Sequence, residues 1–173
     1  MKEIIIIGTI HAGFTPKNEL KEIIQKYNPN QILVEIAEED IKNKKLKSYP
    51  PEMIFTYNWA KQNQIKVNGF DSKINVMKKG VTKKEKQRIM EEGKRLMKSF
   101  TWKDMNKPRN LKKINIKSIE KFVDSKKEKE RQVKMLRNIR KLIVNEGRVI
   151  IITGCGHLDF FKKNIKGAFF PLR

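Results

Sequence analysis

Four short apolar runs along the chain are separated by longer stretches in which apolar residues recur at helical spacing. Isoleucine and valine are frequent in these runs, as in strands that are buried on both faces of a parallel sheet. The runs span residues 2–7, 31–36, 65–69 and 148–153, and a weaker fifth run spans 166–171. Strands that alternate with helices predict an α/β fold, with a mainly parallel sheet flanked by helices.

The helical stretches begin at residues that favour a helix N-terminus or its first turn. Their expected starts are Thr15, Pro50, Thr82 and Ser125. In the second helix we expect Ile54 and Tyr57 on the inner side, from their spacing. The stretch 108–117 has no clear periodicity, and we expect it to be irregular.

Length and charge refine this picture. The 173 residues suit one domain that spans residues 1–173. The 40 Lys and Arg against 19 Asp and Glu give a net charge of +21, and residues 73–141 alone hold 25 basic and 8 acidic residues, which is +17. We therefore expect a Lys-rich helical insertion at about 73–125 in an α/β frame whose charges nearly balance.

The kind of basic residue indicates the kind of partner. Lysine outnumbers arginine 32 to 8, whereas arginine is the better reader of base edges and phosphate groups. The basic segment therefore favours salt-sensitive attraction to polyanions over sequence-specific recognition. Nucleic acid is accordingly a candidate partner of this segment.

Two features exclude other classes of protein. The longest aliphatic run, Ile4 to Ile7, has four residues, whereas a membrane span needs about 18 and a signal-peptide core about 7. A single cysteine, Cys155, rules out a disulfide framework and a zinc site with several thiolates. We expect a cytoplasmic protein without a membrane span.

The chain has two histidines, and each follows a glycine by three positions at the end of a predicted strand. These segments read Gly8-Thr-Ile-His11 and Gly154-Cys-Gly-His157. Ligands of open α/β sheets bind beyond the carboxyl ends of the strands. With right-handed crossovers we expect the strand order 3-2-1-4, which makes the first and fourth strands neighbours and brings both histidines together.

Two carboxylates belong to the same edge of the predicted sheet. Glu35 lies within an apolar strand, where a carboxylate is costly unless it is paired or bound to a metal, and Asp71 ends the third strand. His11, His157 and Glu35 form a candidate ligand set for a divalent metal ion. Alternatively, Glu35 is the general base of a metal-free site in which a histidine polarises the carbonyl group.

Residues beside the histidines are candidates for substrate contact, because glycine lets the backbone approach a ligand closely. They are Gly8, Thr9, Gly154 and Gly156. Structural roles stay open for the same segments: His11 as a packing residue, Glu35 as a carboxylate held by backbone amides, and Asp71 as a turn residue. Cys155 is either a nucleophile or a small residue in a tight turn.

The motifs together resemble the TraB/PrgY (pheromone shutdown) family. The resemblance lies in the two GxxH motifs, in Glu35 at the end of the second strand, and in Glu130-Arg131-Gln-Val-Lys-Met135 before the last motif. The segment from Pro51-Glu52 to Asp71 adds to it. The likeness covers about residues 1–71 and 128–160. Ser72 and Gln132 depart from the family pattern, which often has Arg and Asp or Asn there.

The resemblance implies an α/β site in which His11, Glu35, Asp71, Arg131 and His157 are functional. This family is grouped with Tiki, ChaN-like and erythromycin-esterase-like proteins, which include metal-dependent peptidases, a metal-independent esterase and a haem-binding protein. The resemblance thus predicts a hydrolase for a peptide or small-molecule substrate, with Arg131 stabilising negative charge. The alternatives are a polyanion-binding protein and a non-catalytic protein that binds haem or a peptide.

Overall fold

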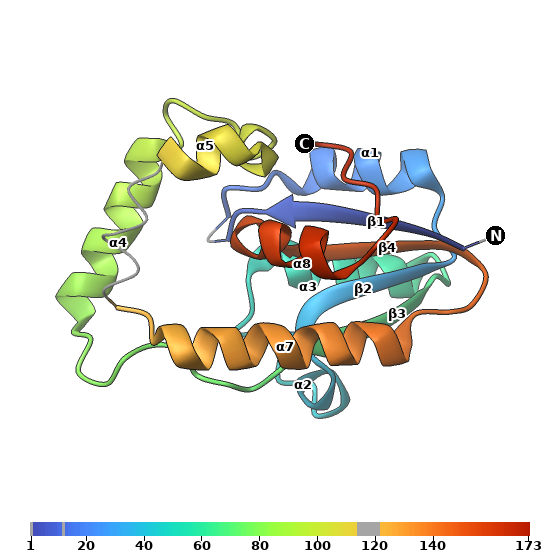
Figure 1. The fold of residues 1–173 in the computed structure, drawn as a ribbon, viewed down its shortest axis with the longest axis horizontal. Helices are drawn as coiled ribbons and strands as arrows, with labels where there is room; N and C mark the ends of the chain where they lie inside the picture. Colours follow the sequence, from blue (N-terminus) through green and yellow to red (C-terminus); the bar gives the residue numbers. More distant parts are fainter. Residues whose placement is uncertain (1, 12, 114–121) are drawn as a thin grey trace.

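Four parallel strands form the sheet of the computed structural model, which describes residues 2–11, 13–113 and 122–173. They are β1 (Lys2–Thr9), β2 (Gln31–Ala37), β3 (Lys66–Asp71) and β4 (Gly147–Gly154). Every strand pair is parallel. The chain therefore forms a single α/β domain of the predicted class (Figure 1).

The strand order is β1-β4-β2-β3, so the expected order 3-2-1-4 is wrong in one place. β4 pairs with β1 as expected, but it lies between β1 and β2. The segment Val149 to Ile152 of β4 is fully buried. In the inner position, β4 forms backbone hydrogen bonds with a strand on each side. The outer edge of β1 is covered by Phe169, which exchanges backbone hydrogen bonds with Ile4 and Ile6. The expected fifth strand is thus a single bridge between Ile5 and Phe169.

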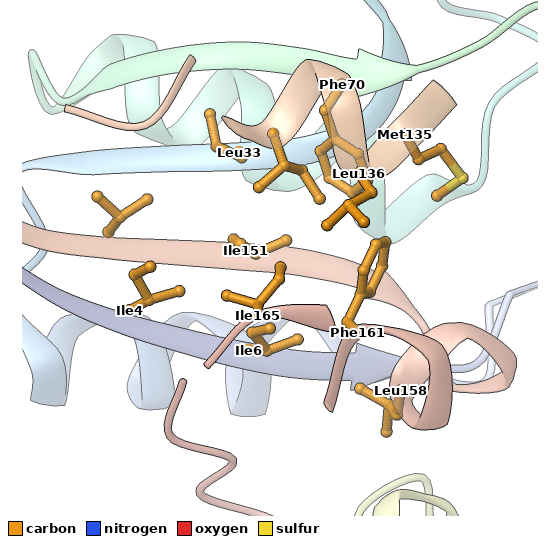
Figure 2. Packing of buried hydrophobic residues seen from close by; sticks show 12 residues of the cluster. Ile4, Ile6, Leu33, Phe70, Met135, Leu136, Ile151, Leu158, Phe161 and Ile165 are labelled. Carbon is orange, nitrogen blue, oxygen red and sulfur yellow. The ribbon is translucent and has the colours of Figure 1, made fainter. Parts of the chain in front are cut away.

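Helices cover both faces of the sheet (Figure 1). One face packs against α1 (Lys17–Tyr27) and α3 (Pro51–Gln62), and the other against α7 (Ser125–Leu142) and α8 (Leu158–Asn164). Successive strand residues point to opposite faces. Ile5 therefore joins the first core, whereas Ile4 joins the second, in which Leu136 and Phe161 face the strands (Figure 2). The short helix α2 (Glu38–Lys42) follows β2 directly.

Two helix predictions are wrong in detail. Thr15 does not cap α1: its hydroxyl contacts the backbone of Ile10 within the loop after β1, and Pro16 takes the cap position. α3 begins at Pro51, but its buried residues are Glu52, Met53, Thr56 and Ala60, whereas Ile54 and Tyr57 are only partly buried. The helix is therefore turned from the expected orientation, which brings Glu52 toward the end of β1.

The basic segment forms α4 (Lys83–Leu96), the 3-10 turn η1 (Asp104–Asn106) and α5 (Pro108–Lys113). The Thr82 capping box that begins α4 is confirmed. Residues 108–113, expected to be irregular, are helical, and 114–117 lie outside the described residues. Figure 1 shows α4 beyond the sheet edge at which β1 ends. No helix in the described ranges is long and apolar enough to cross a membrane.

Candidate active site

The carboxyl ends of the strands meet a cavity of about 730 Å³. Its lining includes the five residues that the sequence pattern and the family resemblance pointed to: His11, Glu35, Asp71, Arg131 and His157. His11 lies in the loop after β1, and Glu35 and Asp71 lie in β2 and β3. Arg131 belongs to α7, and His157 lies in the turn after β4. Both histidines and both carboxylates therefore share one cavity, although β4 separates β1 from β2.

Glu35 contributes a carboxylate that is buried and fully paired. Its Oε2 accepts hydrogen bonds from the Thr153 hydroxyl at 2.7 Å and from the Gly154 N–H at 2.6 Å. Its Oε1 accepts one from Arg131 at 2.7 Å and lies 3.3 Å from His157 Nε2. Burial alone would raise the pKa of Glu35, but its positive partners outweigh burial and hold that pKa well below the usual range. Glu35 is therefore a weak base.

Arg131 joins Glu35 to Asp71. Its Nε and Nη2 donate to the two carboxylate oxygens of Asp71 at 2.9 and 2.8 Å, a bidentate contact that fixes the guanidinium plane. Burial raises the pKa of Asp71 in spite of these hydrogen bonds. Burial opposes the charge of Arg131 as well, but Asp71 and Glu35 together raise the pKa of the guanidinium. This cation is thus held at the cavity by the buried carboxylate of Glu35 and the largely buried carboxylate of Asp71.

His157 is buried between two acidic residues. Its Nε2 faces Glu35, and its Nδ1 lies 3.4 Å from Oε1 of Glu128 and 3.2 Å from the side-chain amide of Gln132. Burial would lower the pKa of His157, but the charge of Glu35 and the contact with it outweigh burial and raise that pKa. A protonated His157 is therefore paired with Glu35 on the Nε2 side, while Nδ1 lies beside the Gln132 amide and Glu128.

His11 makes a separate contact with a different carboxylate. Its Nδ1 lies 2.7 Å from Oε1 of Glu52, a buried residue in the first turn of α3. Burial would lower the pKa of His11, but the hydrogen bond to Glu52 and the charge of Glu35 outweigh burial and raise that pKa. The His11 side chain is 42% exposed. The anchored imidazole therefore leaves its second nitrogen, Nε2, for the cavity.

Gly154 is needed where it stands. A Cβ on Gly154 would lie 2.9 Å from His11 Nε2 and 3.6 Å from Glu35 Oε2, and the first of these distances is too short for the ring to stay in place. The glycine of the second GxxH motif thus makes room for the histidine of the first. This relation links the two motifs through space.

The other candidates for substrate contact divide into two groups. Thr9 and Gly156 line the cavity, as Gly154 does. Gly8 is not among the lining residues: its N–H donates to the buried side chain of Asn106 at 2.9 Å, and a Cβ there would lie 2.7 Å from Leu158. Gly8 therefore serves the packing of η1 and α8 on β1.

Cys155 lines the cavity as a neutral thiol. Burial, together with the negative charge of Glu35, raises the pKa of Cys155 to about 11. A thiol needs to lose its proton to act as a nucleophile, and a raised pKa disfavours that loss at neutral pH. These surroundings favour the interpretation of Cys155 as a small residue in a tight turn.

The arrangement does not fit the expected metal ligand set of His11, Glu35 and His157. Across the part of the chain that the structure describes, no three His, Cys, Asp or Glu side chains are placed to hold one metal ion. Both oxygens of Glu35 already accept hydrogen bonds, and the Arg131 guanidinium occupies the position beside Oε1 that a cation would need. A metal would have to displace this positive charge.

Glu52 has a contact that the sequence pattern did not predict. An acidic residue in the first helical turn is common on protein surfaces, because the helix dipole favours it there. The one sequence feature that indicates burial of Glu52 is its spacing of four and eight residues from Thr56 and Ala60, two small residues on the same buried helix face. Among the described residues, Oε2 of Glu52 has no hydrogen-bond partner, so the fold tolerates an expensive buried group beside His11. An unsatisfied buried group of this kind calls for an explanation, and a catalytic role is one.

Comparison of the chain with protein families, with curated proteins and with solved structures gives no match. The chemistry of the site is therefore inferred from its own geometry.

Proposed function

We propose that the protein is a hydrolase that cleaves an ester or peptide bond in this cavity. The contact between His11 and Glu52 carries the proposal. A carboxylate that holds Nδ1 of a histidine fixes the ring and directs Nε2 at the substrate, which is how a general base is built. The guanidinium of Arg131 and the raised pKa of His157 place positive charge in the same cavity.

In this mechanism neutral His11 takes a proton at Nε2 from a water molecule as the water oxygen attacks the carbonyl carbon. Arg131 and His157 stabilise the negative charge that develops on the carbonyl oxygen. When the tetrahedral intermediate breaks down, the C–O or C–N bond breaks and His11 returns the proton to the leaving group. The contact between Glu52 and Nδ1 keeps the ring in place while the proton moves. Glu35 keeps Arg131 and His157 in place.

Membership of the TraB/PrgY family is part of this proposal. Its support is that His11, Glu35, Asp71 and His157 come from four separate strand ends and line one cavity together with Arg131 of α7. The hydrogen bonds from Arg131 to Asp71 and Glu35 give the Glu-Arg segment of the resemblance a structural role as well.

The pH dependence of hydrolysis tests the mechanism. Only neutral His11 accepts a proton. Burial and Arg131 lower the pKa of His11, but Glu52 and Glu35 outweigh them, so that this pKa is raised. We therefore expect kcat/KM for uncharged esters to rise with pH through a midpoint above 6.5, the usual pKa of histidine. A panel of esters and amides assayed from pH 5 to pH 9 measures this. A profile that is flat or falls, or no hydrolysis of any compound, would contradict the proposal; the latter result favours non-catalytic binding of haem or a peptide.

Metal dependence stays a prediction of the sequence, with a test of its own. If His11 and His157 hold a divalent ion, then His11→Gln and His157→Gln each lower the affinity for Zn²⁺, measured by calorimetry with the metal alone. The exposed Glu22→Gln serves as the control. Equal Zn²⁺ binding by all chains rules out this ligand set, and the geometry of Glu35 and Arg131 leads us to expect that result.

The exposed basic side chains of α4 favour polyanion binding as a second candidate function. They are Lys83, Lys84, Lys86, Arg88, Lys94 and Arg95. We expect single-stranded or duplex nucleic acid to bind at low salt, with an affinity that falls steeply as salt rises. Changing Lys83, Lys84 and Arg88 to glutamine should weaken binding, whereas His11→Gln should not. Absence of binding at low salt removes this candidate.

A further inference from the structure

Among the residues that the structure describes, none forms a packed core beneath one face of α4. Lys86, Ile89, Met90 and Gly93 follow one another at spacings of three, one and three residues, so they share one side of the helix, and all four line the cavity. None of the α4 side chains that the structure describes is buried. An amphipathic helix normally places its apolar side chains against a core. In α4 both described apolar side chains, Ile89 and Met90, face the cavity instead.

Other apolar residues extend this surface around the cavity. Phe14 lies next to α4, because a Cβ on Gly93 would be 3.8 Å from its ring. Ile10 and Val123 also line the cavity. We call Ile10, Phe14, Ile89, Met90 and Val123 the apolar wall. Met90 is 44% exposed, so part of its apolar side chain is open to a ligand at the edge of the cavity.

The apolar wall and the polar groups belong to the same cavity. Its volume of about 730 Å³ falls within the range of about 300–1,000 Å³ that is typical of small-ligand sites. Lys86 is the one residue with a full charge that α4 contributes to the lining. On the α4 side, a ligand that reaches His11 therefore extends along a surface that is mostly apolar and offers only Lys86 to pair a second charge.

We propose that the substrate carries an uncharged apolar substituent next to its scissile bond, and that the apolar wall binds this substituent. The inference rests on the proposed hydrolase function for the identity of the reacting bond. It explains why the chain keeps an amphipathic helix beyond the strand ends (Figure 1). The bound substituent would complete the packing that α4 lacks, and Ile89 and Met90 would determine specificity rather than catalysis.

Binding can be separated from hydrolysis with methyl ketones, which have the shape of alkyl acetate esters but cannot be hydrolysed. We expect the affinity for 2-butanone, 2-hexanone and 2-octanone to rise by about fourfold for each added methylene group that is buried. Calorimetry or chemical-shift titration measures it with the full chain. Met90→Asn and Ile89→Asn should each weaken 2-octanone binding by about tenfold and change 2-butanone little.

Val133→Asn is the matched control, because Val133 is 45% exposed on α7 and does not line the cavity. Circular dichroism verifies that each variant keeps its helices. The apolar wall would be overturned if the affinity did not depend on the length of the alkyl group of the ketone. It would also be overturned if the variants at 89 and 90 bound 2-octanone as tightly as the Val133→Asn control. Dimerisation that Met90→Asn abolishes would overturn it too, since a second copy would then cover the wall. Ketone binding with the expected pattern but without hydrolysis of any ester would refute the hydrolase and not the wall.

Discussion

Replacing His11 by glutamine is expected to lower kcat/KM for ester hydrolysis by about 100-fold to 10,000-fold, the usual contribution of a general base. Glutamine is chosen because its amide can still donate to Glu52, whereas alanine would leave that buried carboxylate with only the longer contact from the Thr9 hydroxyl at 3.5 Å. The chain should keep its stability, since the His11 side chain is 42% exposed and belongs to neither apolar core. Steady-state kinetics and urea unfolding measure the two effects.

Glu52→Gln examines the same pair from the other side. The amide oxygen of glutamine can accept the hydrogen bond from His11 Nδ1, but the negative charge that raises the pKa of His11 is gone. We therefore expect a lower kcat at high pH and a midpoint of the pH profile that moves to lower pH. A purely structural role would change stability and leave this midpoint where it was.

The control is Glu22→Gln, on the exposed side of α1. It also removes one negative charge, but outside the cavity, and should leave both kcat and the midpoint of the pH profile unchanged. Full activity in His11→Gln would mean that another group is the base. A His11→Gln chain that unfolds at much lower urea would leave its rate uninformative, and in that case the midpoint shift in Glu52→Gln decides the role of the pair.

Arg131→Met is expected to lower the free energy of unfolding by about 3–5 kcal/mol near neutral pH. Methionine keeps much of the volume of the side chain but leaves Glu35 and Asp71 without the cation that bridges them. Glu35 is buried and the Asp71 side chain is only 9% exposed, and an unpaired charge in such a place is costly. The matched control is Arg137→Met, which removes an exposed arginine from the same helix and should change stability by less than about 0.5 kcal/mol.

The loss in Arg131→Met should depend on pH in a defined direction. The pKa of Glu35 lies well below its usual range in the native chain, so its contribution to stability is present above pH 4.5 and is lost as pH falls through the native pKa. Without Arg131 the pKa of Glu35 rises, and that of Asp71, already raised by burial, rises further. Protonation then relieves the unpaired charges at low pH.

Urea unfolding of wild type and variant at pH 5 and pH 8 measures this difference. The gap in the free energy of unfolding between the two chains should be smaller at pH 5. A gap that matches the Arg137→Met control, or that widens at pH 5, would show that the two carboxylates do not depend on Arg131.

The elements of the fold and most of the site positions could be predicted from the sequence, because burial leaves a local periodic pattern. Ile4 to Ile7 shows a strand that is covered on both faces, and the two GxxH segments show where loops leave the sheet edge. Glu35 could be identified by the same rule, since a carboxylate within an apolar run needs a partner. These inferences use neighbours along the chain only.

The strand order and the partners of the charged groups depended on the tertiary structure. β4 lies between β1 and β2, but the apolar run of the edge strand β1 is nearly as buried as that of β4, so no local pattern distinguishes the inner strand from the edge strand. His11 meets Glu52 across 41 residues, and Arg131 meets Glu35 across 96. The sequence by itself determined which residues are polar at the strand ends. Which carboxylate binds which cation was decided only by packing, because the rotation of α3 and the position of α7 on the sheet set those distances.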